Sequence, residues 1–219
     1  MNGNKFEQEL ARLHKDLIAM GGAIEEAIEL SINALINQDR EISLSVIEND
    51  KAVNALARTI EGEAMKILLR RQPVAGDLRI ISTALKMVTD MERIGDQARD
   101  ICSIVLHLCE EEYQTKLIHI PQMAQTAKKM VNQCIDSFVR MDLNLAKNVI
   151  ETDNEVDALF AKVRQSMIKL MRENSGYADQ AIYLTMVAKY FEKIGDHAEN
   201  IAEWVIFCKT GERKNIQLL

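Results

Sequence analysis

The sequence predicts an all-α protein built from two tandem, similar three-helix bundles, with six long helices and an internal duplication. The 219 residues include only 2 Pro and 9 Gly, and aromatic side chains make up 5%. Ala, Leu, Ile, Glu, Lys and Met are abundant, a composition that favours helices over sheets. Apolar residues recur at helical spacing along almost the whole chain, and two blocks of ten residues occur twice.

Five short breaks divide the chain into these six helices. Each break combines polar turn residues with a proline, a glycine or a residue suited to cap the next helix. In the second break, Asp77 is expected to cap the helix that follows. The breaks fall at residues 37–39, 72–77, 110–121, 140–142 and 174–177.

The duplication defines the two halves. Residues 47–56 recur as 150–159, and residues 92–101 recur as 192–201, with six of ten positions identical in each comparison. The offsets, 103 and 100, differ by three residues that must be lost in the turn between the two blocks. We therefore predict a first bundle over 1–112 and a second over 113–219, each of which buries its own apolar seam.

Charge and hydropathy exclude several classes of protein. With 27 basic and 33 acidic residues the formal charge is −6, which argues against nucleic-acid binding, because such binding depends on Lys and Arg at the phosphates. No apolar run approaches the ~18 residues of a membrane-spanning helix, so any membrane contact is expected to be peripheral. The four cysteines lack zinc-finger spacing, and we interpret them as reduced thiols of a cytoplasmic protein.

Acidic side chains recur on one face of the third helix of each half. Glu92 and Asp96 are four residues apart, and Glu192 and Asp196 repeat the arrangement with a glycine between them. Like charges at this spacing destabilise a helix by about 0.2–0.5 kcal/mol, and the glycine costs roughly another 1 kcal/mol. Two unfavourable features that occur together in both halves indicate a function. Two plainer explanations stay open, because helical acids are often simply solvated and a glycine also permits tight helix packing.

The preceding helix of each half adds further acids. Because consecutive helices of a bundle run antiparallel, residues equally far from a turn lie side by side. A turn near residue 73 places Asp50 beside Asp96, and a turn near residue 174 places Asp153 beside Asp196. We therefore predict one cluster in each half. The first contains Asp50, Glu92, Asp96 and Asp100, and the second contains Asp153, Asp157, Glu192 and Asp196.

Carboxylates gathered in this way repel one another unless a cation neutralises them. Oxygen-only ligand sets favour Mg, Mn, Ca or Fe over Zn, so we expect each cluster to bind divalent or trivalent metal ions, with Fe, Mn or Mg as the candidates. The Glu-x-x-His pair of ferritin-like di-iron bundles is missing, because Ile194 stands three residues before His197, which we interpret as an ordinary surface or interhelix histidine. Two other functions stay open, a carboxylate-bridged metal-dependent phosphohydrolase and a metal-storage bundle.

Three segments carry a more specific pattern. They are Asp77-Leu78-Arg79, the stretch DMERIGD at residues 90–96, and the stretch FEKIGDHAENIAEWV at residues 191–205. Together with the length and the two-fold repeat, these segments resemble the PhoU family, accessory regulators of the bacterial high-affinity phosphate transport system. The resemblance implies an (E/D)xxxD metal motif in each of two three-helix bundles. Lys193 replaces the commoner arginine of the second motif, and Asp100 stands where the family usually has asparagine, so the two sites need not be equivalent.

The resemblance also implies a function. Proteins of this family are cytoplasmic, often dimeric and non-enzymatic, and they couple the ATPase subunit of the phosphate ABC transporter to a membrane sensor histidine kinase. They restrain phosphate uptake and the phosphate-starvation response when phosphate is plentiful. We therefore expect a homodimer without enzymatic activity. Asp77 and Arg79 are the expected partner or signalling residues, and their replacement is predicted to disturb signalling more than folding.

Overall fold

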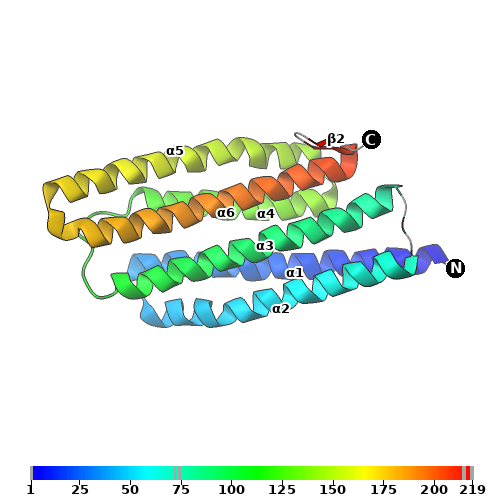
Figure 1. Ribbon diagram of the computed structural model, residues 1–219, viewed down its shortest axis with the longest axis horizontal. Helices are drawn as coiled ribbons and strands as arrows, with labels where there is room; N and C mark the ends of the chain where they lie inside the picture. The colour runs from blue at the N-terminus through cyan, green and yellow to red at the C-terminus, as the bar shows by residue number, and fades with distance from the viewer. Residues whose placement is uncertain (1, 72, 74, 214–215, 218–219) are drawn as a thin grey trace.

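The computed structural model describes residues 2–71, 73, 75–213 and 216–217 (Figure 1). Within these ranges, six α-helices and one 3-10 helix are followed by a short antiparallel hairpin. Their bounds are α1 Asn2–Asn37, α2 Arg40–Arg71, α3 Ala75–Leu108, α4 His119–Arg140, α5 Leu143–Glu173, η1 Ser175–Tyr177, α6 Ala178–Thr210, β1 Glu212–Arg213 and β2 Ile216–Gln217. The predicted all-α fold with six long helices is confirmed, and the hairpin is an addition that the helical pattern did not indicate.

The same turn joins the first two helices of each half. Gln38 and Met141 adopt the left-handed backbone conformation, with φ of 51° and 50°, directly after α1 and α4. The aspartate that follows caps the next helix. Asp39 accepts a hydrogen bond at 2.9 Å from the backbone amide three residues later, and Asp142 accepts from the second and third amides after it. The two turns are 103 residues apart, the offset of the first pair of repeated blocks, so the duplication includes the turn.

The start of α3 differs from the prediction for Asp77. The helix begins at Ala75, so Asp77 lies inside the first turn instead of capping it. A carboxylate in the first turn interacts favourably with the positive end of the helix dipole, which explains why an acid suits either position. Gln72 and Val74, which belong to the predicted break, lie outside the described residues.

The two halves pack against each other through four helices. In Figure 1, α5, α6, α3 and α2 follow one another across the front, and α1 and α4 lie behind them. Helix α1 contacts α4, and α3 contacts α6. Three contacts fix the antiparallel register of α3 and α6: Arg79 Nε to the Cys208 carbonyl at 3.2 Å, the Thr83 hydroxyl to the Trp204 carbonyl at 3.5 Å, and Asp90 Oδ1 to His197 Nδ1 at 2.9 Å. The interpretation of His197 as an interhelix residue is confirmed.

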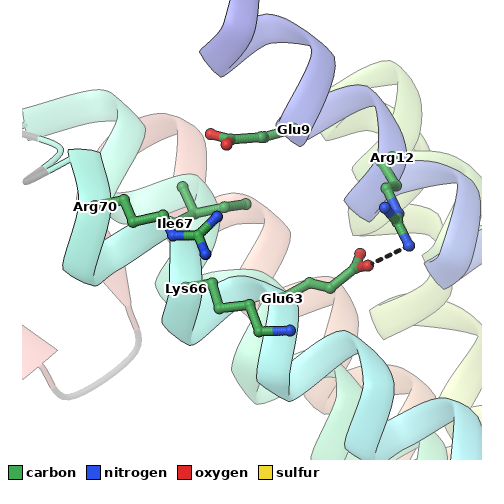
Figure 2. Close-up of a pocket in the computed structure, with 6 residues that line it drawn as sticks. All are labelled: Glu9, Arg12, Glu63, Lys66, Ile67 and Arg70. Carbon is green, nitrogen blue, oxygen red and sulfur yellow. Dashed lines mark ion pairs between the residues drawn. The ribbon is translucent and has the colours of Figure 1, made fainter.

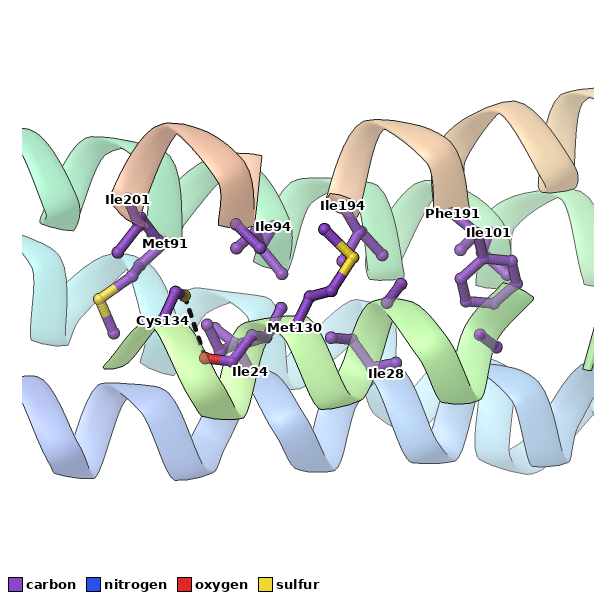
Figure 3. Packing of buried hydrophobic residues seen from close by; sticks show 14 of the residues in the cluster. Ile24, Ile28, Met91, Ile94, Ile101, Met130, Cys134, Phe191, Ile194 and Ile201 are labelled. Carbon is purple, nitrogen blue, oxygen red and sulfur yellow. Dashed lines mark hydrogen bonds between the residues drawn. The ribbon is translucent and has the colours of Figure 1, made fainter. Parts of the chain in front are cut away.

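A single hydrophobic core runs through both halves, so the apolar seams of the two predicted bundles are continuous with each other. Ile24 of α1, Ile94 of α3, Met130 of α4 and Ile194 of α6 are all 0% exposed and belong to one continuous cluster (Figure 3). The physical reason is that each of these four helices has two apolar faces. One face packs inside its own half, and the other packs against the opposite half. No described helix is long and apolar enough to span a bilayer.

Candidate functional site

Gly95 brings α2 and α3 together at the first acidic cluster. A Cβ atom at this position would lie 3.1 Å from Val53 Cγ1 and 3.6 Å from Asp50 Oδ1, both on α2. The absence of a side chain therefore lets the Asp50 carboxylate reach the acidic face of α3. The prediction that Asp50 lies beside Asp96 is confirmed, because the Arg99 guanidinium contacts both.

Arg99 occupies the centre of this first cluster. Its Nη1 lies 2.8 Å from Asp96 Oδ1 and 3.3 Å from Asp50 Oδ2, and its Nη2 lies 2.9 Å from Asp100 Oδ1. Asp50 is only 8% exposed, and its Oδ2 also accepts a hydrogen bond from the Asn54 amide at 2.9 Å. Partial burial opposes the charge on Arg99, but its contacts with the three carboxylates outweigh that effect and raise its pKa. The first cluster therefore contains its own cation.

Glu92 stands apart from this arrangement. It is half-buried one helical turn before Asp96 and makes no hydrogen bond or ion pair with another described residue. The structure thus brings Asp50, Asp96 and Asp100 together around Arg99 and leaves Glu92 at the edge.

Gly195 has the equivalent role in the second cluster. A Cβ atom there would lie 3.0 Å from Asp153 Oδ1 on α5, and this oxygen is buried without a hydrogen-bond partner among the described residues. Burial raises the pKa of Asp153 to about 7, and the charges of four acidic neighbours add to the effect. In decreasing order of effect, these neighbours are Glu199, Asp157, Asp196 and Glu192. The structure therefore brings all four predicted residues of the second half together and adds a fifth acid.

Two lysines of α6 neutralise this second cluster in part. Lys189 pairs with Glu192, and Lys193 pairs with Asp196 and, at 3.7 Å, with Glu192. The hydrogen bond to Asp196 raises the pKa of Lys193. Because the two lysine side chains are 44% and 42% exposed, their ammonium groups lie at the solvent edge of the cluster.

The residue pair that most distinguishes the clusters, Arg99 and Glu199, is one that sequence reasoning does not single out. The two positions correspond at the 100-residue offset, so the charge is reversed between equivalent places in the repeat. Motif matching passes over them because both lie outside the (E/D)xxxD pattern. A comparison of the two halves by charge would find them.

The clusters differ in how well they suit a metal ion. Within the described ranges, no three or more His, Cys, Asp or Glu side chains stand in a ready-made metal-binding arrangement, so binding requires side chains to move. The second cluster fits, because it offers oxygen donors only and includes a buried Asp153 oxygen without a partner. The first cluster does not fit, because Arg99 already lies between its three carboxylates.

The predicted signalling residues lie near the start of α3. Asp77 is exposed, whereas Arg79 is half-buried and donates a hydrogen bond to the Cys208 carbonyl in the last turns of α6. Arg79 therefore ties the two halves together at this end of the molecule. Its role in signalling stays a prediction.

A pocket of about 270 Å³ lies between the start of α1 and the end of α2 (Figure 2). Its charged groups already neutralise one another in part. Arg12 pairs with Glu63 at 2.7 Å, and Glu9 pairs with Arg71 at 2.9 Å. We assign no function to this pocket, because its mixture of acidic and basic groups indicates neither a cation nor an anion.

The fold and the clusters define a class of protein, an all-helical bundle of two similar halves with a group of carboxylates between the second and third helix of each half. The PhoU domain profile matches residues 17–105 and 120–205. The chain therefore belongs to the PhoU family.

Named relatives and solved structures agree with this assignment. The phosphate-specific transport system accessory protein PhoU homolog of Pseudomonas aeruginosa is 36% identical over 94% of this chain and 86% of the relative. The accessory protein PhoU of Escherichia coli K12 is 30% identical over 95% of this chain and 86% of its own length. The crystal structure of PhoU from Pseudomonas aeruginosa has 35% identity and a TM-score of 0.91, covering 94% of this chain and 100% of the other. The phosphate transport system regulatory protein PhoU from Streptococcus pneumoniae, at 24% identity and a TM-score of 0.89, shares the fold over 96% of this chain and 100% of its own.

Proposed function

We propose that this chain is an accessory protein of a phosphate-specific transport system and that it restrains phosphate uptake and the phosphate-starvation response. The observation that carries the proposal is the match to relatives that bear this description, over 94% of this chain in the Pseudomonas aeruginosa protein. Membership of the PhoU family through both halves supports it further.

In this proposal the chain is a cytoplasmic adaptor without enzymatic activity. It links the ATPase subunit of the phosphate ABC transporter to a phosphate sensor histidine kinase, acts as a homodimer, and reaches the membrane only through its partners. The outer helices α2 and α5, of 32 and 31 residues, each leave a long face exposed, which suits docking of partner helices and loops.

We also propose that the second cluster binds a divalent or trivalent metal ion, with Fe, Mn or Mg as the candidates. Asp153 and Asp157 of α5 and Glu192 and Asp196 of α6 would hold it. A bound metal would supply positive charge to the cluster. The role of the chain's own residues is to position carboxylates from both helices, which Gly195 permits by leaving room for Asp153.

A phosphate-starvation reporter in a deletion strain tests the proposed function. In abundant phosphate the reporter is expected to be switched on, and the wild-type gene is expected to switch it off again. A reporter that stays silent in the deletion strain contradicts the restraining role.

Two biochemical assays separate the alternatives. Hydrolysis of a generic phosphate ester with added Mn or Mg, abolished by Glu192→Gln with Asp196→Asn, would favour a phosphohydrolase. High metal occupancy in a protein whose deletion leaves the reporter silent would favour metal storage.

A further inference from the structure

The two acidic clusters occupy equivalent places in the repeat but differ in charge at one central position. Arg99 of α3 corresponds to Glu199 of α6. Each acts on the equivalent aspartate of the preceding helix. Arg99 contacts Asp50 at 3.3 Å, and Glu199 is the acidic residue that acts most strongly on Asp153.

Arg99 makes the contacts that a bound cation would make. Its nitrogen atoms lie within 3.3 Å of oxygens from Asp50, Asp96 and Asp100, and Nε also donates to Asp100 Oδ1 at 3.1 Å. A guanidinium keeps its charge at any physiological pH and presents five N–H donors in a rigid plane. The nearly buried Asp50 carboxylate is thus neutralised by the chain itself.

In the described part of the second half the cations paired with the cluster are lysines of α6, and none of them stands at the position equivalent to Arg99. Glu199 adds a negative charge at the equivalent position. Lys189 and Lys193 pair with the acids of α6 from the solvent edge, and Asp153 Oδ1 has no hydrogen-bond partner among the described residues.

We infer that Arg99 is a built-in cation that closes the first cluster to metal, so that each chain binds metal in its second half alone. This inference rests on the proposed metal binding of the second cluster. A guanidinium and a metal ion do not share the same three carboxylates, because the two cations repel each other and the oxygens already accept N–H donors. One oxygen of Asp50 has no hydrogen-bond partner among the described residues. This single oxygen does not suffice for metal binding, because a hard cation needs a set of about six oxygen ligands.

A reciprocal exchange of the two residues tests the inference. Wild type, Arg99→Glu and Glu199→Arg are stripped of metal, equilibrated with MnCl2, and assayed for bound Mn by elemental analysis. Arg99→Glu is expected to double the bound Mn, and Glu199→Arg is expected to abolish binding. The matched control is Arg93→Gln, because the Arg93 side chain pairs with Asp96 at 3.3 Å but is 62% exposed, and this variant is expected to bind as wild type does.

Loss-of-ligand variants locate the wild-type metal. Binding is expected to survive Asp50→Asn with Asp96→Asn and to disappear in Asp153→Asn with Asp196→Asn. The inference is overturned if the first pair of substitutions removes the wild-type Mn, or if Arg99→Glu binds no more Mn than wild type while folding normally by circular dichroism.

A metal-free measurement separates failure of this inference from failure of metal binding as such. If neither the wild type nor any variant binds Mn, the proposed metal site is wrong. The role of Arg99 as the internal cation is then tested by thermal melting in EDTA at neutral pH. Arg99→Gln is expected to melt several degrees below Arg93→Gln, because it leaves three close carboxylates without their cation, and equal melting temperatures would overturn the inference.

Discussion

Alanine substitutions at four helical glycines test whether close helix packing positions the two clusters. Gly22 of α1 and Gly62 of α2 have room for a methyl group, since no non-local heavy atom lies within 4 Å of an added Cβ. At Gly95 the methyl would lie 3.1 Å from Val53 Cγ1, and at Gly195 it would lie 3.0 Å from a buried carboxylate oxygen. The same chemical change is therefore expected to stabilise the protein at Gly22 and Gly62 but not at Gly95 and Gly195.

The magnitudes follow from two competing contributions. Replacing a helical glycine by alanine stabilises by about 1 kcal/mol, which Gly22→Ala and Gly62→Ala are expected to show in full. Overpacking costs about 1–3 kcal/mol, so Gly95→Ala and Gly195→Ala are expected to range from neutral to about 2 kcal/mol less stable than wild type. For a chain of this size each kcal/mol corresponds to about 2–4 °C in melting temperature.

The assay is thermal and urea unfolding in EDTA, followed by circular dichroism, with all four variants in one buffer. Gly195→Ala is also expected to weaken Mn binding, because its methyl group displaces Asp153, whereas Gly62→Ala leaves binding unchanged. If Gly95→Ala and Gly195→Ala melt as high as Gly22→Ala and Gly62→Ala, the close approach of the helices at the clusters is refuted.

Four further changes test other parts of the structure. Asp142→Ala removes the cap of α5 and is expected to cost about 1 kcal/mol in urea unfolding, and an unchanged midpoint would contradict the capping role. Phe191→Ala empties a fully buried position and is expected to cost about 3–5 kcal/mol, whereas a loss below that range would show that the core collapses around the gap. Burial and acidic neighbours raise the pKa of Asp153 from 3.8 to about 7, so between these pH values the folded protein binds a proton that the unfolded chain has lost. The folded protein therefore becomes less stable as the pH rises from 3.8 to about 7. Metal-free Asp153→Asn should melt above wild type at pH 8 and show no such advantage at pH 4. Iodoacetamide should modify Cys109 first in the folded protein, because the other three cysteines are buried, and mass spectrometry that finds one of those labelled first would show an opening of the core.

Local physical chemistry explains which features could be predicted from the sequence. The turns at residues 37–39 and 140–142 depend on residues that lie next to one another in the chain, a left-handed residue followed by a capping aspartate. The approach of Asp50 to Asp96 follows from the antiparallel course of two helices around a turn. The position of that turn was therefore sufficient to predict that the two side chains lie close together.

Other features depend on long-range packing and side-chain conformation. Which helices share the core, namely α1, α3, α4 and α6, could not be predicted, because a helix with more than one apolar face does not indicate which neighbour each face will contact. The direction of the Arg99 side chain, toward Asp50 and Asp100 and not toward solvent, depends on rotamers that no spacing rule specifies. The start of α3 was misplaced by three residues, because Asp77 suits the first turn as well as the cap.

The covalent joining of two similar halves has a consequence for how their sites can diverge. In a symmetric dimer of single three-helix units, any substitution appears twice, so an arginine introduced into one carboxylate cluster would enter the other as well. In this chain the corresponding positions are encoded separately, so Arg99 on α3 and Glu199 on α6 can coexist in one molecule. Fusion of the repeats thus lets one half neutralise its carboxylates with its own arginine while the other half retains an excess of acidic side chains.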